Sequence, residues 1–544
     1  MSADPVVVVG SGASGVHFAW SVLAAGRRVI LVDVGRSGDE PRHLDADLTE
    51  LRRRLDDPFD HFLGPNYESL ILPGRDDEYY GFPPGKAHVF QGLDGHEIDA
   101  RGFAPLLSYA RGGLAEAWTG GSYAFDDREL RDFPFAPEAL RAGYARVAER
   151  IGITGAADDL QRFFPVPDAD HETPPPLDAH AARLLANYES HRERLNARDS
   201  FFLGRARLAL LGADRGRRRA CDELGRCLWG CPIGALWTPS WTLGDLEHHE
   251  RFEYRPGLVA QRFESDDGGR VQRLVVRPSA GGAESAIDVG TLVLCAGTLA
   301  TARIVLETAR RESGSAPELR GLMDNRQVLM PFVSPKMVGR RFEAASYQYH
   351  ALACALDLGG PEDYVHGLIT TLKTALIHPI VATLPLSMRG SLRYFRNLHA
   401  ALGLVNVNFS DGPRDDNRVA LEGEGAHARL FVRYAPPPGE AQRLADATGR
   451  LRRILKRLGA VAPRSMQHTR PMGASVHYAG TLPMSHHGGD FTTHPDGRVR
   501  PFQNLICADG SVLPWLPAKN LTFSLMANAT RIAELHFGPP RRER

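Results

Sequence analysis

The sequence predicts an α/β fold in which a domain with a parallel sheet is interrupted by a second, α+β domain built on an antiparallel sheet. The first residues follow the order strand, glycine turn, helix and strand, which is a βαβ unit. A strand, glycine turn and helix return in that order at residues 288–308. After these regions, residues 417–421 and 428–436 alternate apolar and polar side chains, which suits an antiparallel sheet.

The composition is that of a globular protein with a large core. The chain has 544 residues and 43% hydrophobic residues, enough for two or three domains. Sixty-five basic residues balance sixty-five acidic ones, so no net charge attracts nucleic acid. The N-terminal "MSADPVVVVGSG" has no basic segment before its short apolar run, and we therefore expect a cytoplasmic protein.

No segment has the eighteen or so uncharged apolar residues that a spanning helix needs, and we expect no stable membrane insertion. The nearest candidate is residues 367–386, which contain Lys373, His378 and Pro379. We predict that it forms a buried or lid-forming helix pair.

The first βαβ unit carries a nucleotide-binding fingerprint. Gly10, Gly12 and Gly15 form G-x-G-x-x-G between the first strand and the helix that ends near Gly26. This spacing allows a tight turn, a close approach of a pyrophosphate to the backbone, and close packing of helix on strand. Asp33 ends the next strand about 20 residues on, where a carboxylate can bind a ribose hydroxyl. These residues favour a dinucleotide but do not choose between NAD and FAD.

The remaining elements follow in order. Residues 134–153 predict a helix with Pro137 near its start, because apolar residues recur at intervals of three and four. Short strand-like segments fill residues 251–278 before the α/β pattern returns. We expect a discontinuous nucleotide-binding domain and a substrate-binding cap. The first comprises residues 1–135, 200–310 and 470–544, and the second residues 136–199 and 311–469.

The C-terminal region carries the most specific motifs. The chain has "SVHYAGTLPMS" at 475–485 and "VRPFQNLICADGSVLPWLPAKNLTFSLMANATRIAELHF" at 499–537. The order H-x-x-G-T, N-L-x-x-x-D-x-S-x-x-P and N-x-T before a closing helix resembles the glucose-methanol-choline (GMC) flavoprotein oxidoreductases. The resemblance implies FAD as cofactor and the GMC fold, a Rossmann-like FAD domain with an inserted cap. It also implies that His477 is the catalytic base and that Asn520 holds the substrate hydroxyl.

These roles agree with the chemistry of alcohol oxidation. A proton must leave oxygen as hydride leaves carbon, and a neutral histidine can take that proton. The amide of Asn520 can donate and accept hydrogen bonds without competing for the proton. The last helix, beginning near Thr522, would place its positive dipole end beside the flavin ring.

Other segments agree with the same resemblance. "YARGGLAEAWTGG" (109–121) is similar to a stretch of pyranose oxidases, a GMC branch. Ala117 stands where some of those enzymes bind FAD covalently through histidine, so we expect non-covalent FAD. "LCAGTLATARIVLET" (294–308) resembles the second family signature. The cofactor-binding residues that these segments imply, beyond the fingerprint, are Gly112, Gly113, Thr119, Val259, Ala296, Gly297, Asp509, Gly510 and Thr522.

Three cysteines lie close together in "CDELGRCLWGCP" (221–232), spaced C-x5-C-x3-C. In a reducing compartment a lasting disulfide is disfavoured, which leaves metal binding or packing. Zinc would need a fourth ligand, for which only Asp222 and Glu223 are nearby. The segment resembles that of bacterial FAD-dependent glucose dehydrogenases of the GMC family. That resemblance implies that Cys221, Cys227 and Cys231 hold a [3Fe–4S] cluster; packing around a buried turn is the alternative.

The sequence therefore predicts an FAD-dependent enzyme that oxidises an alcohol to a carbonyl. The electron acceptor is dioxygen or, with a cluster, an electron-transfer protein. The pyranose oxidase and glucose dehydrogenase similarities favour a sugar, glycoside or polyhydroxylated substrate, whereas the apolar 367–386 segment favours a lipophilic alcohol. A flavin-binding redox protein without alcohol-oxidising activity is the alternative from another class.

Overall fold

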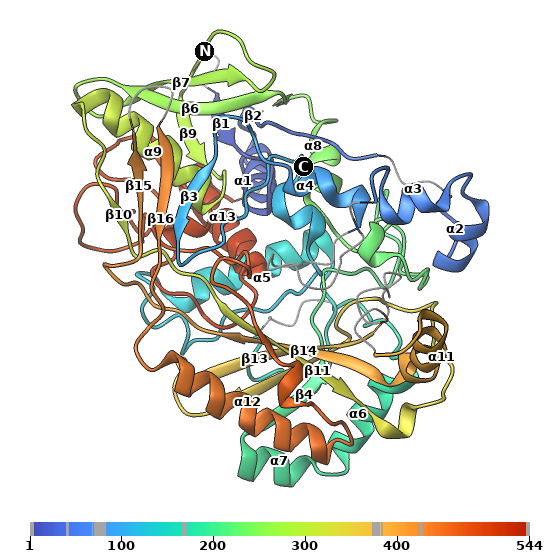
Figure 1. The fold of residues 1–544 in the computed structure, drawn as a ribbon. Coiled ribbons are helices and arrows are strands. Elements are labelled where there is room, and N and C mark those ends of the chain that lie inside the picture. Colours follow the sequence, from blue (N-terminus) through green and yellow to red (C-terminus); the bar gives the residue numbers. More distant parts are fainter. Residues whose placement is uncertain are drawn as a thin grey trace.

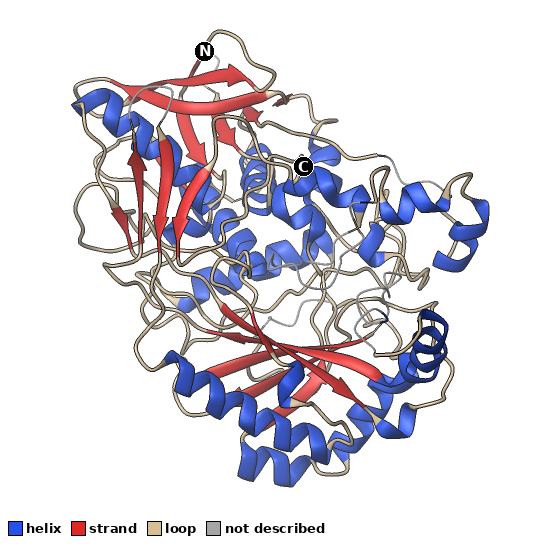
Figure 2. Ribbon diagram, viewed as in Figure 1, coloured by secondary structure: helices blue, strands red, loops and turns tan. Residues whose placement is uncertain are grey.

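The computed structural model of the protein describes residues 5–39, 43–67, 69, 83–165, 171–372, 381, 385–423 and 428–539. Two groups of sheets lie at opposite ends of the molecule, with helices in the layer between them (Figure 1; Figure 2). This arrangement confirms the predicted α/β fold with an additional antiparallel sheet.

A five-stranded parallel sheet forms the centre of the first half. Its strand order is β18-β9-β1-β2-β5, and every neighbouring pair is parallel. The strands β1 and β2 are fully buried, because helices or other sheets cover both faces of a parallel sheet. The strands are β1 (Val6–Val9), β2 (Val29–Val32), β5 (Phe252–Arg255), β9 (Thr291–Leu294) and β18 (Leu505–Cys507).

Helices pack against this sheet from segments far apart in the sequence. The helix α1 connects β1 to β2, as the predicted βαβ unit requires, and it packs against the C-terminal α13, which packs against α5. The helices of this half are α1 (Ala13–Ala24), α5 (Pro137–Ile151), α8 (Pro239–Leu246), α9 (Thr298–Ser313) and α13 (Thr522–Phe537).

Two smaller sheets extend the same half. One is the antiparallel β6-β7-β8, and the other has the order β10-β15-β16-β3. Val419 and Leu430, from β15 and β16, belong to the same hydrophobic core as the parallel sheet. The strands are β3 (Ile98–Arg101), β6 (Leu258–Ser265), β7 (Val271–Pro278), β8 (Ser285–Asp288), β10 (Leu319–Arg320), β15 (Arg418–Glu422) and β16 (Arg429–Arg433).

The second half is built on a six-stranded antiparallel sheet of order β17-β11-β14-β13-β12-β4. The helices α6, α7 and α12 cover the lower face of this sheet in Figure 1, and they enclose a second hydrophobic core. The strands are β4 (Phe201–Arg205), β11 (Arg326–Val333), β12 (Leu352–Asp357), β13 (Tyr364–Thr371), β14 (Leu402–Phe409) and β17 (His468–Thr469). The helices are α6 (Ala179–Glu189), α7 (Arg192–Asp199), α11 (Met388–Leu398) and α12 (Glu440–Arg457).

The predicted domain ranges differ from the observed halves at three places. Strand β4, inside the predicted nucleotide-binding range 200–310, belongs to the six-stranded sheet. Strands β10, β15 and β16, inside the predicted cap range 311–469, belong to the first half, and so does helix α5, inside the predicted cap range 136–199. Each segment takes its place by contacts with residues distant in the chain, which sequence order does not reveal.

The predicted helix pair at 367–386 is wrong in its first part. Residues 367–371 belong to strand β13, and residues 373–380 and 382–384 lie outside the described residues. A short apolar run fits a buried strand as well as a helix, and here pairing with β12 and β14 decides. In the described residues, no helix is both long and apolar enough to cross a membrane.

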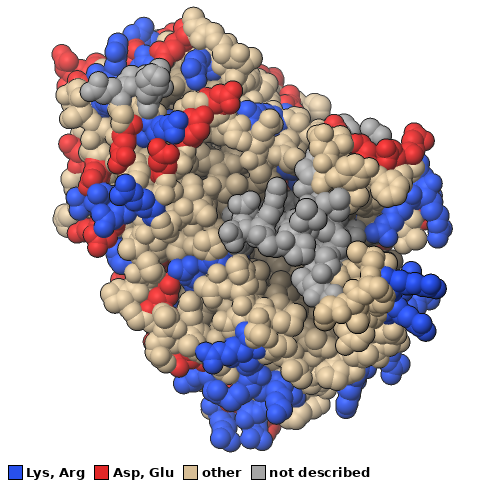
Figure 3. Space-filling model, in the orientation of Figure 1, with Lys and Arg blue, Asp and Glu red and all other residues tan. Residues whose placement is uncertain are grey.

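Residues 36–105 contain short helices as well as loops. The described part holds α2 (Leu48–Arg54), α3 (Pro58–Leu63) and α4 (Ala87–Phe90). Figure 3 shows acidic and basic side chains interspersed over the upper half of the visible face, as the zero net charge predicts. Lys and Arg gather at the bottom of that face, where Figure 1 places α7 and α12.

Candidate active site

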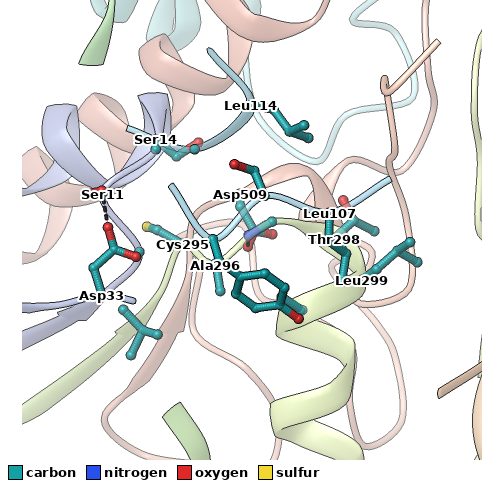
Figure 4. A pocket seen from close by; sticks show the side chains of 18 of the residues that line it. Ser11, Ser14, Asp33, Leu107, Leu114, Cys295, Ala296, Thr298, Leu299 and Asp509 are labelled. Atoms are coloured by element: carbon teal, nitrogen blue, oxygen red, sulfur yellow. Dashed lines mark hydrogen bonds between the residues drawn. The ribbon is translucent and has the colours of Figure 1, made fainter. Parts of the chain in front are cut away.

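A cavity of about 220 Å³ opens where the parallel strands β1, β2 and β9 end. The carboxyl ends of parallel strands are where ligands bind in open α/β sheets. Most of the predicted cofactor-binding residues line this cavity. They are Gly10, Gly12, Asp33, Gly113, Val259, Ala296, Gly297, Asp509, Gly510 and Thr522. Figure 4 labels Asp33, Ala296 and Asp509 among them.

The three fingerprint glycines have different surroundings. Gly10 has a φ of +99°, and a Cβ there would lie 2.5 Å from the Cys295 carbonyl oxygen. A Cβ on Gly15 would lie 1.9 Å from the Gly10 carbonyl oxygen, so this glycine lets α1 pack on its own turn. A Cβ on Gly12 would have no atom nearer than the Gly112 carbonyl oxygen at 4.0 Å. The space at Gly12 is therefore open toward the cavity, which leaves room for a phosphate to approach the backbone.

Asp33 lies at the edge of the same cavity. The hydroxyl of Ser11 donates a hydrogen bond to the Asp33 carboxylate (Figure 4), and the Tyr254 hydroxyl lies 3.5 Å from it. Burial raises the pKa of Asp33 to about 6, against the opposing effect of these hydrogen bonds. Its position at the end of β2 is the one from which a carboxylate can bind a ribose hydroxyl.

Asp509 and the start of α13 close the cavity on another side. One oxygen of Asp509 accepts hydrogen bonds from the Gly297 amide at 2.9 Å and the Thr301 hydroxyl at 2.5 Å. The other oxygen accepts one from the Ser511 amide at 2.9 Å. Helix α13 has no side-chain cap at its N-terminus, and Thr522 in its first turn lines the cavity. Free backbone N–H groups and a positive dipole end therefore face the space.

Three of the predicted cofactor-binding residues, Gly15, Gly112 and Thr119, do not line the cavity. Gly15 contacts the glycine turn from within α1, as described above. The Gly112 amide donates to the Ser11 hydroxyl at 2.8 Å, so Gly112 supports the residue that bonds Asp33. The Thr119 carbonyl accepts from the Tyr347 hydroxyl at 3.0 Å, which joins this loop to the second half of the molecule.

His477 and Asn520, 43 residues apart in the chain, lie side by side in space. The Asn520 Nδ2 atom is 3.3 Å from His477 Nε2. Their neighbours Val476, Tyr478 and Leu521 line the cavity, so the pair stands at its border. Burial lowers the pKa of His477 to about 4, and the charge of Arg470 adds to this shift. At neutral pH the imidazole is therefore uncharged and able to accept a proton.

The hydrogen bonds of Asn325 determine which ring nitrogen of His477 carries the hydrogen. Asn325 Nδ2 donates to the carbonyls of Phe409 and Pro517, each at 2.9 Å. Its Oδ1 atom, which can only accept, is then 3.0 Å from His477 Nδ1. His477 Nδ1 must donate to it, which leaves the lone pair on Nε2, beside Asn520.

A buried carboxyl holds the loop that carries His477. Asp324 accepts hydrogen bonds from the Gly473 amide at 2.6 Å, from the His477 amide at 3.2 Å and from the Ser475 hydroxyl. Burial raises the pKa of Asp324 to about 7. Val476, next to His477, has a φ of +55°, an unusual value for a β-branched residue. The loop is thus fixed by several contacts against its own backbone preference.

Asp324 and Asn325 contact the His477 loop and were missed by sequence reasoning. They form an Asp-Asn pair directly before β11, and their partners are 84 to 192 positions away in the chain. The only available signal was two adjacent polar residues before an apolar strand, which is common in proteins. Lys519 was also missed. It is fully buried beside Asn520, and its ammonium contacts Glu129 at 2.5 Å.

The three clustered cysteines do not form a metal site in this structure. Within the described residues, no group of three or more His, Cys, Asp or Glu side chains could hold a metal ion. All six cysteines are free, so a disulfide is excluded here. Cys221, Cys227 and Cys231 are partly buried against an aromatic and aliphatic cluster that includes Tyr349. Burial raises the pKa of Cys221 to about 11 and raises that of Cys227 as well, so without a bound metal both thiols stay protonated at neutral pH.

Comparisons with known proteins agree with this geometry. A family model described as GMC oxidoreductase matches residues 413–529. A 6'''-hydroxyparomomycin C oxidase from Streptomyces lividus is 25% identical over 352 residues; the alignment covers 60% of this chain and 59% of that relative. A paromamine 6'-oxidase from Streptomyces fradiae is 23% identical over 98% of this chain and 91% of its own length.

A solved structure shows the same fold. Pyridoxine 4-oxidase from Mesorbium loti superposes with a TM-score of 0.57 over 98% of this chain and 99% of its own, at 14% sequence identity. At that identity the likeness concerns the fold alone.

Proposed function

Because the chain belongs to the GMC oxidoreductases, we propose that it binds FAD in the cavity and oxidises an alcohol to a carbonyl. The observation that carries the proposal is the pair His477 and Asn520, with an unprotonated Nε2 atom 3.3 Å from an amide nitrogen at the border of that cavity. A neutral base and a hydrogen-bond donor at one point are what removal of a hydroxyl proton requires.

The residues of the cavity fit FAD. Gly12 leaves open space beside the backbone for the pyrophosphate, and Asp33 stands where a ribose hydroxyl would lie. The uncapped start of α13 favours negative charge near Thr522. Ala117, in the short helix Gly113–Ala117, offers no nucleophile, which supports non-covalent binding. Bound FAD would supply the acceptor for the hydride that leaves the alcohol carbon.

The residues of this chain then perform the following steps. Asn520 donates a hydrogen bond to the alcohol oxygen and orients it. His477 takes the hydroxyl proton on Nε2 as the C–H bond gives up its hydride, so that the C–O bond becomes a carbonyl. Asn325 accepts from Nδ1 and stabilises the imidazolium that forms.

A sugar-like or otherwise polyhydroxylated substrate is supported by two of the relatives, which are named as oxidases of hydroxyparomomycin C and of paromamine. Because these two relatives are named oxidases, dioxygen is the favoured acceptor. An electron-transfer protein would be the acceptor if the three cysteines held a [3Fe–4S] cluster. Their arrangement does not fit one here, and no step is derived through it. A cytoplasmic location stays a prediction from the sequence.

The test is the spectrum of the purified protein loaded with FAD. We expect flavin absorption that bleaches under anaerobic conditions on addition of an alcohol, and hydrogen peroxide when air is admitted. A panel of sugars, aminoglycoside sugars and simple primary alcohols identifies the class. Protein that binds FAD but is bleached by no alcohol would contradict the proposed activity and leave a redox protein without alcohol oxidation. Iron in a ratio of three per chain would contradict our assignment of the acceptor.

A further inference from the structure

One face of the six-stranded sheet packs on the core under the helices, and the other face carries a second apolar cluster together with buried polar side chains. Along β14, Val405, Val407 and Phe409 belong to the core that α6 and α12 cover. Successive side chains of a strand point to opposite faces. Asn406 and Asn408 therefore point away from those helices, toward the half of the molecule that carries the cavity.

The strand register extends this polar face to a histidine. Asn408 pairs with His366 of β13, so the two side chains lie next to each other on one face. The His366 ring lies 4.4 Å from the ring of Tyr123, measured between centroids. Tyr123 packs in the apolar cluster on this face of the sheet, and the next residue, Ala124, belongs to the core of the first half, so this row of side chains lies at the junction between the two halves.

Several polar atoms at this junction have no hydrogen-bond partner among the described residues. Asn408 is fully buried, and both its Nδ2 and its Oδ1 atoms lack partners. The same holds for the Asn406 Oδ1, His366 Nε2 and Asn520 Oδ1 atoms. Buried polar groups in native proteins almost always have partners, because an unpaired one loses its hydration without compensation. A row of such atoms on one face offers hydrogen-bond partners to a polar ligand or to ordered water.

The row begins close to the catalytic pair. The Phe409 carbonyl, one residue after Asn408, accepts a hydrogen bond from Asn325, and Asn325 contacts His477 Nδ1 at 3.0 Å. On the other side, the Lys519 ammonium lies 5.4 Å from the centroid of the Tyr364 ring, on β13 two residues before His366. Lys519 directly precedes Asn520 in the chain. Two residues therefore connect this face of the sheet to the catalytic pair. Asn325 contacts β14 and His477, and Lys519 contacts β13 and precedes Asn520.

We propose that Asn408, Asn406 and His366 bind the hydroxyl groups of a polyhydroxylated substrate whose reacting carbon lies at His477. The assignment rests on the proposed function and deepens it by naming the residues that select the substrate. A neutral amide donates and accepts at once, and so does a neutral imidazole, which matches vicinal hydroxyl groups. An apolar alcohol would leave these atoms unpaired, and a site built for hydrogen bonds rejects such a ligand strongly.

The experiment compares two substrate types in one variant. Asn408→Leu keeps the branched shape and removes both polar atoms. Anaerobic flavin reduction is measured with paromamine, with D-glucose and with 1-butanol. We expect the KM for the polyhydroxylated compounds to rise by about 10- to 100-fold, while the KM for 1-butanol changes by less than about twofold. The kcat changes less than the KM, because the His477–Asn520 pair is intact.

A matched control lies on the other side of the same sheet. Asn187 of α6 donates to the Leu458 carbonyl at 2.7 Å, far from the polar face. Asn187→Leu should lower the melting temperature and leave both KM values unchanged. Asn408→Leu should leave the melting temperature of the substrate-free enzyme unchanged or raised, because it removes an unpaired amide. If Asn408→Leu fails to fold, Asn406→Leu replaces it.

The possible results distinguish a failure of this inference from a failure of the proposed function. If wild-type protein oxidises polyhydroxylated compounds and the variant keeps their KM, the row binds structural water and the inference is overturned. If wild-type protein oxidises only 1-butanol-like alcohols, the inference is overturned and the proposed function stands. If wild-type protein oxidises no alcohol and calorimetry detects no binding of paromamine or D-glucose, both fail.

Discussion

The two halves of the molecule offer different parts of the chain to a small molecule. The parallel half offers backbone: glycines without side chains, the free N–H groups at the start of α13, and one carboxylate at Asp33. The antiparallel half offers side chains that project from strands, such as Asn408 and His366. Backbone recognition needs particular residues at a fixed spacing, so it leaves a motif in the sequence. Side-chain recognition across strands leaves none, because neighbours on a sheet face are far apart in the chain.

The largest effect should come from the residue that touches the reacting hydroxyl. His477→Ala should lower the rate of anaerobic flavin reduction by about 10²- to 10⁴-fold, as expected for the loss of a general base. FAD content, read from the visible spectrum, should stay the same because the cavity does not depend on this side chain. Unchanged turnover in this variant would refute the assignment of the base.

FAD binding by the backbone of the parallel-sheet half can be tested by adding a single methyl group. Gly12→Ala puts a Cβ into open space, with no φ in the left-handed region, so the apoprotein should fold normally. It should weaken FAD binding by about 10- to 100-fold, the value of one or two charge-assisted hydrogen bonds. Gly85→Ala is the matched control, since Gly85 also has open space but lies outside the cavity. Equal FAD affinities of the two variants would place the pyrophosphate elsewhere.

Asn325 contacts both Phe409 of the antiparallel half and His477 beside the cavity. Asn325→Leu removes the acceptor for His477 Nδ1, so the ring loses its fixed orientation and its hydrogen position. We expect turnover to fall by about 10- to 100-fold, as for other residues that orient a catalytic side chain. The dissociation constant of FAD, measured by fluorescence quenching, should not change. A parallel loss of FAD binding would instead indicate that Asn325 only supports the fold.

The pH dependence follows from the burial of His477. Burial disfavours the charged imidazolium and lowers the pKa to about 4, so the base is active above that pH and lost below it. Its contribution to the acid limb of kcat/KM should therefore lie near pH 4 rather than near 6.5. Asn325→Asp puts a negative charge beside Nδ1, raises this pKa and should move the limb upward. An identical limb in both proteins would assign it to another group.

The smallest effect is expected at the clustered cysteines. Cys227→Ser removes a partly buried thiol that contacts an apolar cluster. We expect a modest loss of thermal stability and a rate of anaerobic flavin reduction within about threefold of wild type, since small changes of buried side chains cost on the order of 1 kcal/mol. Metal analysis of the wild-type protein accompanies this test. Bound iron that disappears in the variant would restore the [3Fe–4S] prediction.

Part of the fold could be predicted from sequence because the first βαβ unit is local in the chain. Residues 6–32 form strand, helix and strand as their pattern predicts, and α5 begins at Pro137 as expected. The prediction of a helix was wrong for residues 367–371, because a short run of apolar residues fits a buried strand as well as a helix. The sequence also did not show which sheet β4 and β15 join, since both strands pair with strands that are distant in the chain.

The sequence alone determined the glycine turn at Gly10 to Gly15, because that spacing has a physical reason, and it singled out His477 and Asn520 because their motifs resemble those of the GMC family. Only the tertiary structure decided that Asn325 fixes the hydrogen on His477 and that Asn408 stands beside His366. The physical reason is that a hydrogen bond depends on distance in space. Its partners in this site come from loops and strands that meet only when the two halves pack together.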